Sequence, residues 1–290
     1  MATLCRLLIP TDFSEHDAVV YQFIEQAKAR GPVAAHFVHI LQPPVLPAFE
    51  LAAVDYVQNY VAGIEKTVRE QLAQLPHHPD LKGVEVTTEL VTASRRSFAD
   101  ELAHQATAQK ADFIVTLSKH RQGLDELLLG SMLLKIVQRA PVPTWVLSPG
   151  QLPQVQRILF ATDFSKASTE IFLQVASLAR WLGASVFLAK ISTPADYETT
   201  RQFNATYRAF LEDLTLNNLE ARELIQDVFH INAEELPLGI EHCAEDNLVD
   251  AIALATHGRR GFNLLMNGSV TQEVLEITQL PVVVYPIAEG

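Results

Sequence analysis

One eight-residue phrase occurs twice in this chain, half a chain apart. It reads LLIPTDFS at residues 7–14 and ILFATDFS at residues 158–165. A second pair of matching segments lies late in each half, GLDELLLGS at 123–131 and GFNLLMNGS at 261–269. Self-similarity at a long fixed interval is typical of a duplicated structural unit. We therefore expect two similar domains built on one plan.

The intervals between the copies show where the two halves differ. Asp163 follows Asp12 by 151 residues, whereas Gly268 follows Gly130 by only 138. The second copy is therefore 13 residues shorter, and the loss falls in its middle. A loop or a helix end absorbs such a change most easily.

Length and composition fit two ordinary globular domains. The chain has 290 residues, of which 48% are hydrophobic, enough for two cores. We place the domains at residues 1–150 and 151–290, with a polar linker at 151–156. Cys5 and Cys243 are too few for a disulfide framework and form no CxxC motif, so we expect two buried thiols and no metal site.

Charge and hydropathy limit the kinds of partner that the protein can bind and the cellular compartment expected for it. The net charge of −12 disfavours binding to nucleic acid or to an anionic membrane. The first residues lack the basic and then apolar pattern of a secretory signal, and no apolar run of 18 residues is present. We therefore expect a cytoplasmic protein with neither a nucleic-acid nor a membrane partner.

Short apolar runs alternate with amphipathic segments along the whole chain. The runs predict strands at 6–11, 33–41, 84–91, 112–117 and 143–147, and again at 157–162, 185–191, 224–231, 249–254 and 281–285. The amphipathic segments predict helices from about 14, at 56–75, 98–109 and 132–139, and then at 166–182, 203–222, 236–245 and 270–278. Parallel strands need such crossover connections. The predicted class is α/β, with two tandem Rossmann-like doubly wound domains, each a five-stranded parallel sheet flanked by helices.

A doubly wound sheet binds its ligands beyond the carboxyl ends of the strands, where the strand order reverses. The residues at those ends are Asp12, Ile40 and Leu117 in the first half, and Asp163, Ile191 and Ala255 in the second. The second half also offers glycines at 258, 261 and 268 followed by Ser269, and glycines with a helix N-terminus can hold a phosphate. Alternatively, Gly258 and Gly261 only form turns, and Ser269 caps a helix with Gln272.

Four features together resemble the universal stress protein family. They are the TDFS strand end, the HGRRG segment at 257–261, the GSV helix start at 268–270 and the closing PVVV strand at 281–284. The whole chain resembles the tandem two-domain members, which implies a stress-linked regulatory protein that binds ATP or a related adenine nucleotide, with or without Mg. The nucleotide-binding members carry a Gly-x2-Gly-x9-Gly-Ser/Thr motif. The second half matches it except for Ala255 at the first glycine.

The resemblance also implies roles for individual residues of the second half. Asp163 and Ile191 would line the region of adenine and ribose, and Leu254 and Ala255 would flank the base. Gly258, Gly268, Ser269 and Val270 would hold the phosphates. These assignments carry over the family motif position by position.

The first half departs further from the motif. Leu117 and His120 replace the first two glycines, and only Gly130 and Ser131 remain. Side chains at both positions obstruct a close approach of phosphate, although Lys119 and His120 could supply charge there. Asp12, Ile40, Gly130 and Ser131 are therefore the weaker equivalents, and Asp12 could simply cap a local turn.

Of five other functions, three are disfavoured and two stay open. GxxxxGK[ST], GxGxxG and GxSxG are all absent, which argues against a fast NTPase, a dinucleotide enzyme or an esterase. A slow ATP hydrolase stays open, with no catalytic residue assigned, as does an interaction module of the same fold without a nucleotide. We also expect the last strands, 143–147 and 281–285, to pair within one chain as a pseudo-dimer, and two chains could associate into a homodimer.

Overall fold

The computed structural model describes six stretches of the chain: residues 4–42, 54–93, 96–118, 126–150, 152–257 and 268–287. Within them, strands and helices alternate as the sequence predicts. The strands are β1 Cys5–Pro10, β2 Val33–Leu41, β3 Glu85–Thr92, β4 Phe113–Leu117, β5 Thr144–Leu147, β6 Arg157–Ala161, β7 Ser185–Ser192, β8 Ile225–Asn232, β9 Ala251–His257 and β10 Val282–Ile287. Each predicted strand thus has a counterpart.

The helices follow the same plan. They are α1 Asp17–Lys28, α2 Val54–Gln74, α3 Phe98–Ala108, α4 Glu126–Arg139, α5 Lys166–Leu182, α6 Thr200–Asn217, α7 Leu219–Arg222, α8 Leu236–Asp246 and α9 Gly268–Ile277, with 3-10 turns η2 Leu75–His77, η3 Pro79–Leu81 and η4 Pro194–Asp196. The α/β class with parallel strands flanked by helices is confirmed.

Two helices differ most from their predicted bounds. The predicted helix 203–222 is divided at Asn218, whose side-chain oxygen accepts a hydrogen bond from the Ala221 N–H at 3.0 Å and so starts α7 as a separate turn. α4 begins at Glu126 rather than at Met132. Gly130 lies inside α4, and a single glycine costs a helix only about 1 kcal/mol and does not stop it.

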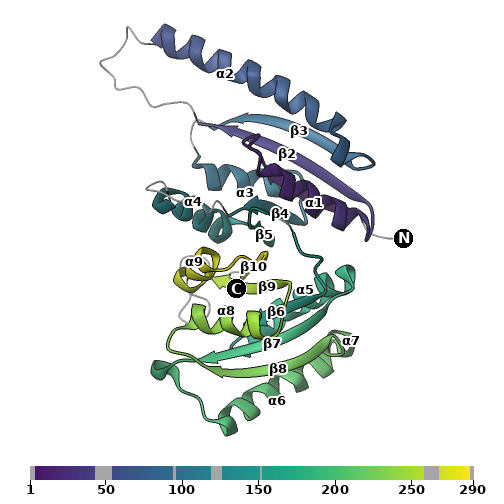
Figure 1. Ribbon diagram of the computed structural model, residues 1–290, viewed down its shortest axis with the longest axis vertical. Coiled ribbons are helices and arrows are strands. Elements are labelled where there is room, and N and C mark those ends of the chain that lie inside the picture. The colour runs from purple at the N-terminus through teal and green to yellow at the C-terminus, as the bar shows by residue number, and fades with distance from the viewer. Residues whose placement is uncertain are drawn as a thin grey trace. The chain divides into compact units, whose positions relative to one another are not determined.

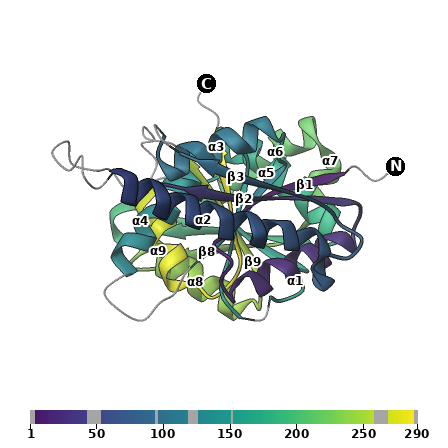
Figure 2. The same ribbon diagram turned by 90° about the horizontal axis from the view of Figure 1, so that it is seen from above.

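The chain packs as two compact units. The first contains residues 1–116 and 139–142, and the second contains 117–138 and 143–290. In the first unit the strand order is β3-β2-β1-β4, and all pairings are parallel. α1 and α2 lie on one face of β2 and β3, and α3 lies on the other (Figure 2).

In the second unit the strand order is β5-β10-β9-β6-β7-β8. The strands β10, β9, β6, β7 and β8 all pair in parallel, which is the five-stranded sheet expected for this half (Figure 1). β10 then pairs antiparallel with β5, with Val283 opposite Trp145. The last strands of the two repeats therefore pair, as the sequence analysis expects.

Each face of this second sheet buries its own core. One face carries Leu159, Ile191, Ile252 and Val282 with residues of α4, α8 and α9. The other face packs against α5, which contacts β6, β7, β9 and β10. Alternation along each strand sends successive side chains to opposite cores, so both faces are covered by helices, as in a doubly wound sheet.

The shortening of the second repeat lies mainly between its second and third strands. β2 ends at Leu41 and β3 begins at Glu85, whereas β7 ends at Ser192 and β8 begins at Ile225. This connection contains the long helix and its flanking turns, and the strands on either side of it still pair in parallel in both repeats, with a register shift at Val186 and Phe187 in the second. Within the described residues, no helix combines the length and the apolar character needed to cross a membrane.

Candidate functional site

The strand order of the second unit reverses at β6. From β6, the chain places β7 on one side and β9 on the other. In an open parallel sheet, the helices that follow two such strands leave toward opposite faces, which opens a crevice at the carboxyl ends. The turn that follows β6, Thr162 to Ser165, lies at this crevice. It is the second copy of the repeated TDFS phrase.

This turn has an unusual backbone that both repeats share. Phe164 has φ of 60°, and its counterpart Phe13 has φ of 58°. A bulky residue in this left-handed region costs roughly 1–3 kcal/mol and persists only where its surroundings hold it. The threonine two residues earlier holds the phenylalanine in this conformation in both copies, because its Oγ1 accepts a hydrogen bond from the phenylalanine N–H at 3.0 Å.

The Phe164 ring adds a second constraint in the second unit. It is buried, and its centre lies 5.1 Å from that of Phe210 and 5.9 Å from that of Phe203, both on α6. Tyr207 of the same helix also contacts it, at 5.3 Å, and burial raises the pKa of the Tyr207 hydroxyl. Anchored in this way, the ring fixes the direction in which the neighbouring Asp163 leaves the turn.

The Asp163 carboxylate is held by two donors of its own segment. Its Oδ1 accepts hydrogen bonds from the Ser165 N–H at 2.9 Å and from the Ser168 Oγ at 2.5 Å. Ser165 is also the N-cap of α5, because its Oγ accepts from the Ser168 N–H at 3.3 Å. Asp163 thus caps the turn that follows it through the Ser165 N–H, and this contact keeps the carboxylate at the carboxyl edge of the sheet.

Main-chain groups from both neighbouring strands face the space beyond the end of β6. The Ala189 carbonyl accepts from the Thr162 N–H at 2.9 Å, so alternation turns the N–H and C=O of Ile191 to the same side, past the end of β6. On β9, the Ile252 N–H donates to Pro281 on the β10 side, so the main chain of Ala255 faces β6. A planar ligand there would meet amide groups from two sides.

The side chains of three predicted site residues point elsewhere. Ile191 and Leu254 of the sheet and Val270 of α9 all belong to the buried core between the sheet and the helices α8 and α9. Ile191 packs so closely against α8 that a Cβ added at Gly239 would lie 2.6 Å from its Cγ2. These residues could therefore contact a ligand only through their main chain. Ala255 is buried on the opposite face, toward α5.

The predicted phosphate segment lies partly outside the described residues. Gly258 is outside them, whereas Gly268 and Ser269 form the first turn of α9. α9 connects β9 to β10, and these two strands are parallel, so α9 runs back from the carboxyl edge and its N-terminus lies at that edge. Its free N–H groups therefore lie at the same edge of the sheet as Asp163.

A half-buried ion pair borders the site. Lys190 Nζ lies 2.6 Å from Glu198 Oε2, with side-chain exposures of 13% and 16%. The same ammonium lies 5.9 Å from the centre of the Phe164 ring, and Glu198 also accepts from Thr206 of α6 at 3.3 Å. Lys190 therefore ties the start of α6 to β7, with its charge already balanced by Glu198.

The first unit builds the same turn with different neighbours. Asp12 Oδ1 accepts from the Ser14 N–H at 3.1 Å. Asp17, at the position of Ser168, instead accepts a hydrogen bond from the Thr11 hydroxyl at 2.7 Å. His39, at the position of Lys190, stacks on Phe13 with ring centres 5.4 Å apart, and its Nδ1 donates to the Thr11 carbonyl at 2.9 Å. The crevice is therefore lined differently in the two units.

The other predicted site residues of the first half are placed as follows. Ile40 is buried in β2, and its main chain faces the space beyond β1, because the Val38 carbonyl accepts from the Thr11 N–H. Gly130 and Ser131 lie within α4 rather than at its start. Their main-chain N–H groups are therefore not those of a helix N-terminus. Lys119 and His120 lie outside the described residues.

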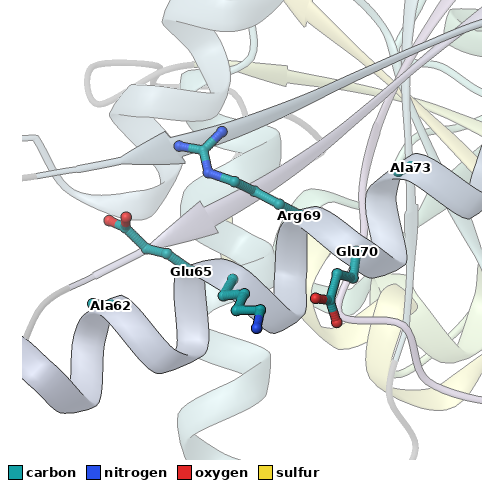
Figure 3. A pocket seen from close by; sticks show the side chains of 6 residues that line it. Ala62, Glu65, Arg69, Glu70 and Ala73 are labelled. Carbon is teal, nitrogen blue, oxygen red and sulfur yellow. The ribbon is translucent and has the colours of Figure 1, made fainter.

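Two further features of the described part of the chain bear on ligands. No cluster of three His, Cys, Asp or Glu side chains suited to a metal ion occurs there. A hollow of about 440 Å³ lies along α2 in the first unit and is lined by Ala62, Glu65, Lys66, Arg69, Glu70 and Ala73 (Figure 3). These six residues belong to one helix, and none of them is a predicted site residue.

Comparison with known families identifies this architecture. Residues 5–148 and again residues 154–286 match the model of the universal stress protein family. The chain belongs to the universal stress protein family. It carries two copies of the family's domain in tandem, as the repeated TDFS turns and glycine segments indicate.

Two solved structures have the same fold as this chain, and one further relative is similar to it in sequence. A universal stress protein of Archaeoglobus fulgidus DSM 4304 has a TM-score of 0.69 at 18% identity, covering 98% of this chain and 97% of that chain. PA1789 of Pseudomonas aeruginosa PAO1 has a TM-score of 0.60 at 14% identity, covering 97% and 92%. Universal stress protein Slr1230 of Synechocystis is 29% identical over 163 residues, which cover 54% of this chain and 51% of that protein. The match thus spans about half the length of that relative.

Proposed function

We propose that the second domain binds ATP or a related adenine nucleotide at the crevice beyond β6, and that the protein acts in a stress response by binding rather than by catalysis. The observation that carries this proposal is the convergence of three elements at one edge of the sheet. They are the fixed Asp163 carboxylate, the main-chain groups of Ile191 and Ala255, and the N-terminus of α9.

Each element suits a different part of a nucleotide. The main-chain N–H and C=O groups of Ile191 and Ala255 can pair with the donor and acceptor edge of adenine. The Asp163 carboxylate accepts hydrogen bonds from an amino group or a ribose hydroxyl, and it repels phosphate. The first turn of α9, Gly268 and Ser269, presents free N–H groups and the positive end of the helix dipole to phosphates. Charge therefore sets the direction of the bound nucleotide.

The donors fit a nucleotide better than they fit a resident metal ion. A hard cation such as Mg²⁺ needs several carboxylate or carbonyl ligands. Among the described residues of the site, Asp163 supplies a single carboxylate at the carboxyl edge of the sheet, and no cluster of three acidic, His or Cys side chains is found. We propose that any Mg²⁺ arrives with the phosphates of ATP. At this site the ion would neutralise phosphate charge.

The matched glycines of the two halves provide the test. Calorimetry with ATP on the whole chain should show one strong site. Gly268→Leu should abolish it, because the added side chain obstructs the first turn of α9, whereas Gly130→Leu should leave nearly all binding intact. Two equal sites per chain would contradict the assignment to the second domain. Lack of binding by the unmodified protein would favour an interaction module without a nucleotide.

We also propose a cytoplasmic location and association of two chains into a homodimer. The net charge of −12, which disfavours association with an anionic membrane, motivates the first part. Light scattering on purified protein would measure the mass of the assembly directly. A mass of 32.1 kDa would be that of a single chain and would contradict the homodimer.

A further inference from the structure

We infer that Ser168 is a positioning residue of the nucleotide site: its hydroxyl fixes the Asp163 carboxylate, and the exchange of this serine for Asp17 in the first half helps to make the two halves unequal. This inference rests on the proposed nucleotide site in the second domain. It assigns a role to a residue that lies outside the repeated TDFS phrase and outside the glycine segment.

The geometry of the contact carries the inference. The distance from Ser168 Oγ to Asp163 Oδ1 is 2.5 Å, short for a hydrogen bond and typical of a hydroxyl that donates to a carboxylate. Ser168 is buried, with 1% of its surface exposed, and Asp163 is partly exposed, so the donor of this bond is shielded from water. Ser165 Oγ contacts Ser168 Oγ at 3.3 Å and accepts from its N–H, which limits the rotamers available to Ser168.

A carboxylate held in this way has lost its freedom before a ligand arrives. The Ser165 N–H and the Ser168 hydroxyl both bind Oδ1, so rotation about the Cβ–Cγ bond would break two hydrogen bonds. The ordering cost is therefore met during folding and not during binding. Removing Ser168 should weaken binding even though Ser168 itself need not touch the nucleotide.

The first half shows what replaces this contact. Asp17 stands 151 residues before Ser168, the same interval that separates Asp12 from Asp163. An ionised aspartate accepts hydrogen bonds and cannot donate one to a second carboxylate. Asp17 binds the Thr11 hydroxyl instead, at 2.7 Å, and is 6% exposed. Asp12 thus has a buried like charge five residues away where Asp163 has a hydroxyl donor.

The first experiment measures Ser168→Ala by calorimetry, with ATP and with adenosine as probes. We expect the Kd for both to rise about three- to tenfold, the effect of one lost hydrogen bond. Both probes should respond alike, because Asp163 lies at the base end of the proposed site. Ser177→Ala is the matched control: Ser177 lies on the same helix, and its hydroxyl donates to the Leu173 carbonyl at 2.9 Å, so affinity should not change.

A double-mutant cycle separates positioning from general support of the fold. In an Asp163→Ala background, Ser168→Ala should cause no further loss of affinity, because the group it positions is gone. Ser168→Cys, which is close in size and has a weak S–H donor, serves as the second variant if the alanine variant does not fold, and it should show the same direction of change.

The outcomes distinguish the inference from the proposed function. If the unmodified protein binds adenine compounds and folded Ser168→Ala binds them equally well, the positioning role is wrong and the site stands. An equal loss from Ser168→Ala with and without Asp163 would also overturn it. If the unmodified protein binds neither ATP nor adenosine, the proposed function itself fails, and the inference falls with it.

Discussion

The two TDFS turns share a backbone and differ in what surrounds it. Phe13 and Phe164 have nearly the same positive φ, and each is held by the hydroxyl of the threonine two residues earlier. α5 begins directly after its N-cap Ser165, whereas α1 begins only at Asp17, three residues beyond Ser14. The duplicated phrase therefore preserves the turn, while residues a few positions later decide what the turn presents.

The start of α1 shows the physical reason for this difference. The Asp17 N–H donates to the Ser14 carbonyl at 3.1 Å, whereas the corresponding Ser168 N–H donates to the Ser165 hydroxyl. A tight i to i+3 turn thus replaces side-chain capping in the first half. The helix that the sequence predicts from about residue 14 starts three residues later, at Asp17, and His16 precedes it without a side-chain cap.

The largest expected effect concerns the two strand-end acids. Asp163→Ala should weaken ATP and adenosine binding about 10- to 100-fold, because a hydrogen bond to a charged group contributes roughly 1.5–3 kcal/mol. Asp12→Ala is the matched control and should leave the affinity unchanged. Calorimetry beside ligand-free melting curves measures both. If both substitutions weaken binding equally, the two halves are functionally alike and the comparison breaks.

A substitution that copies the second half into the first should affect stability and not binding. Asp17→Ser removes the carboxylate that accepts from Thr11 at 2.7 Å and that lies favourably at the N-terminus of α1. We expect a loss of about 1.5 kcal/mol in the free energy of unfolding, measured with denaturant. The Kd for ATP should stay within twofold, since the glycines of the first half are still missing. A new ATP site in this variant would show that Asp17 alone disables the first half.

The smallest effect concerns pH. His36 Nε2 lies 3.4 Å from Glu89 Oε2 in the first unit, with the His36 side chain 12% exposed. Burial lowers the pKa of His36, and Glu89 only partly opposes this. As pH falls below the unfolded value near 6.5, the unfolded chain takes up a proton that the folded chain resists, so stability falls. The contribution should stay below about 1 kcal/mol.

The second unit supplies the control for this pH effect. Phe187 and Phe229 occupy the positions of His36 and Glu89, stacked with ring centres 6.2 Å apart, and neither ionises. The double substitution His36→Phe and Glu89→Phe should therefore reduce the drop in melting temperature between pH 7.5 and pH 5.5. An unchanged drop would assign the pH dependence to other groups.

The sequence predicts elements better than it predicts contacts. Helix 166–182 and strand 33–41 agree with the structure at both ends. Their signals, apolar periodicity and local caps, depend only on residues that are close together in the sequence. The positive φ of Phe164 could not be expected, since a bulky aromatic residue rarely adopts it. Without that turn, the short contact between Ser168 and Asp163 could not be foreseen either.

For the candidate site, too, the sequence predicted the positions of residues along the strands but not the direction of their side chains. Sequence placed Asp163, Ile191 and Ala255 at the ends of their strands. The structure brings the carboxyl ends of these strands together at one edge, although β9 continues for two residues beyond Ala255. It did not show that the side chain of Ile191 belongs to the core and that only its main chain faces the crevice. Strand parity decides that orientation, and a one-residue uncertainty in register reverses it.

The pairing of β5 with β10 also means that β5 is synthesised long before its partner strand. All four residues of β5 are buried in the folded chain, yet Trp145 meets its partner Val283 only when the last strand has been made. At about 5–20 residues per second, the ribosome needs roughly 7 to 28 s to add the intervening chain. Throughout that time β5 presents an unpaired apolar edge, which is a template for pairing with another nascent chain. The tandem arrangement thus exposes the growing polypeptide to aggregation until its final strand emerges.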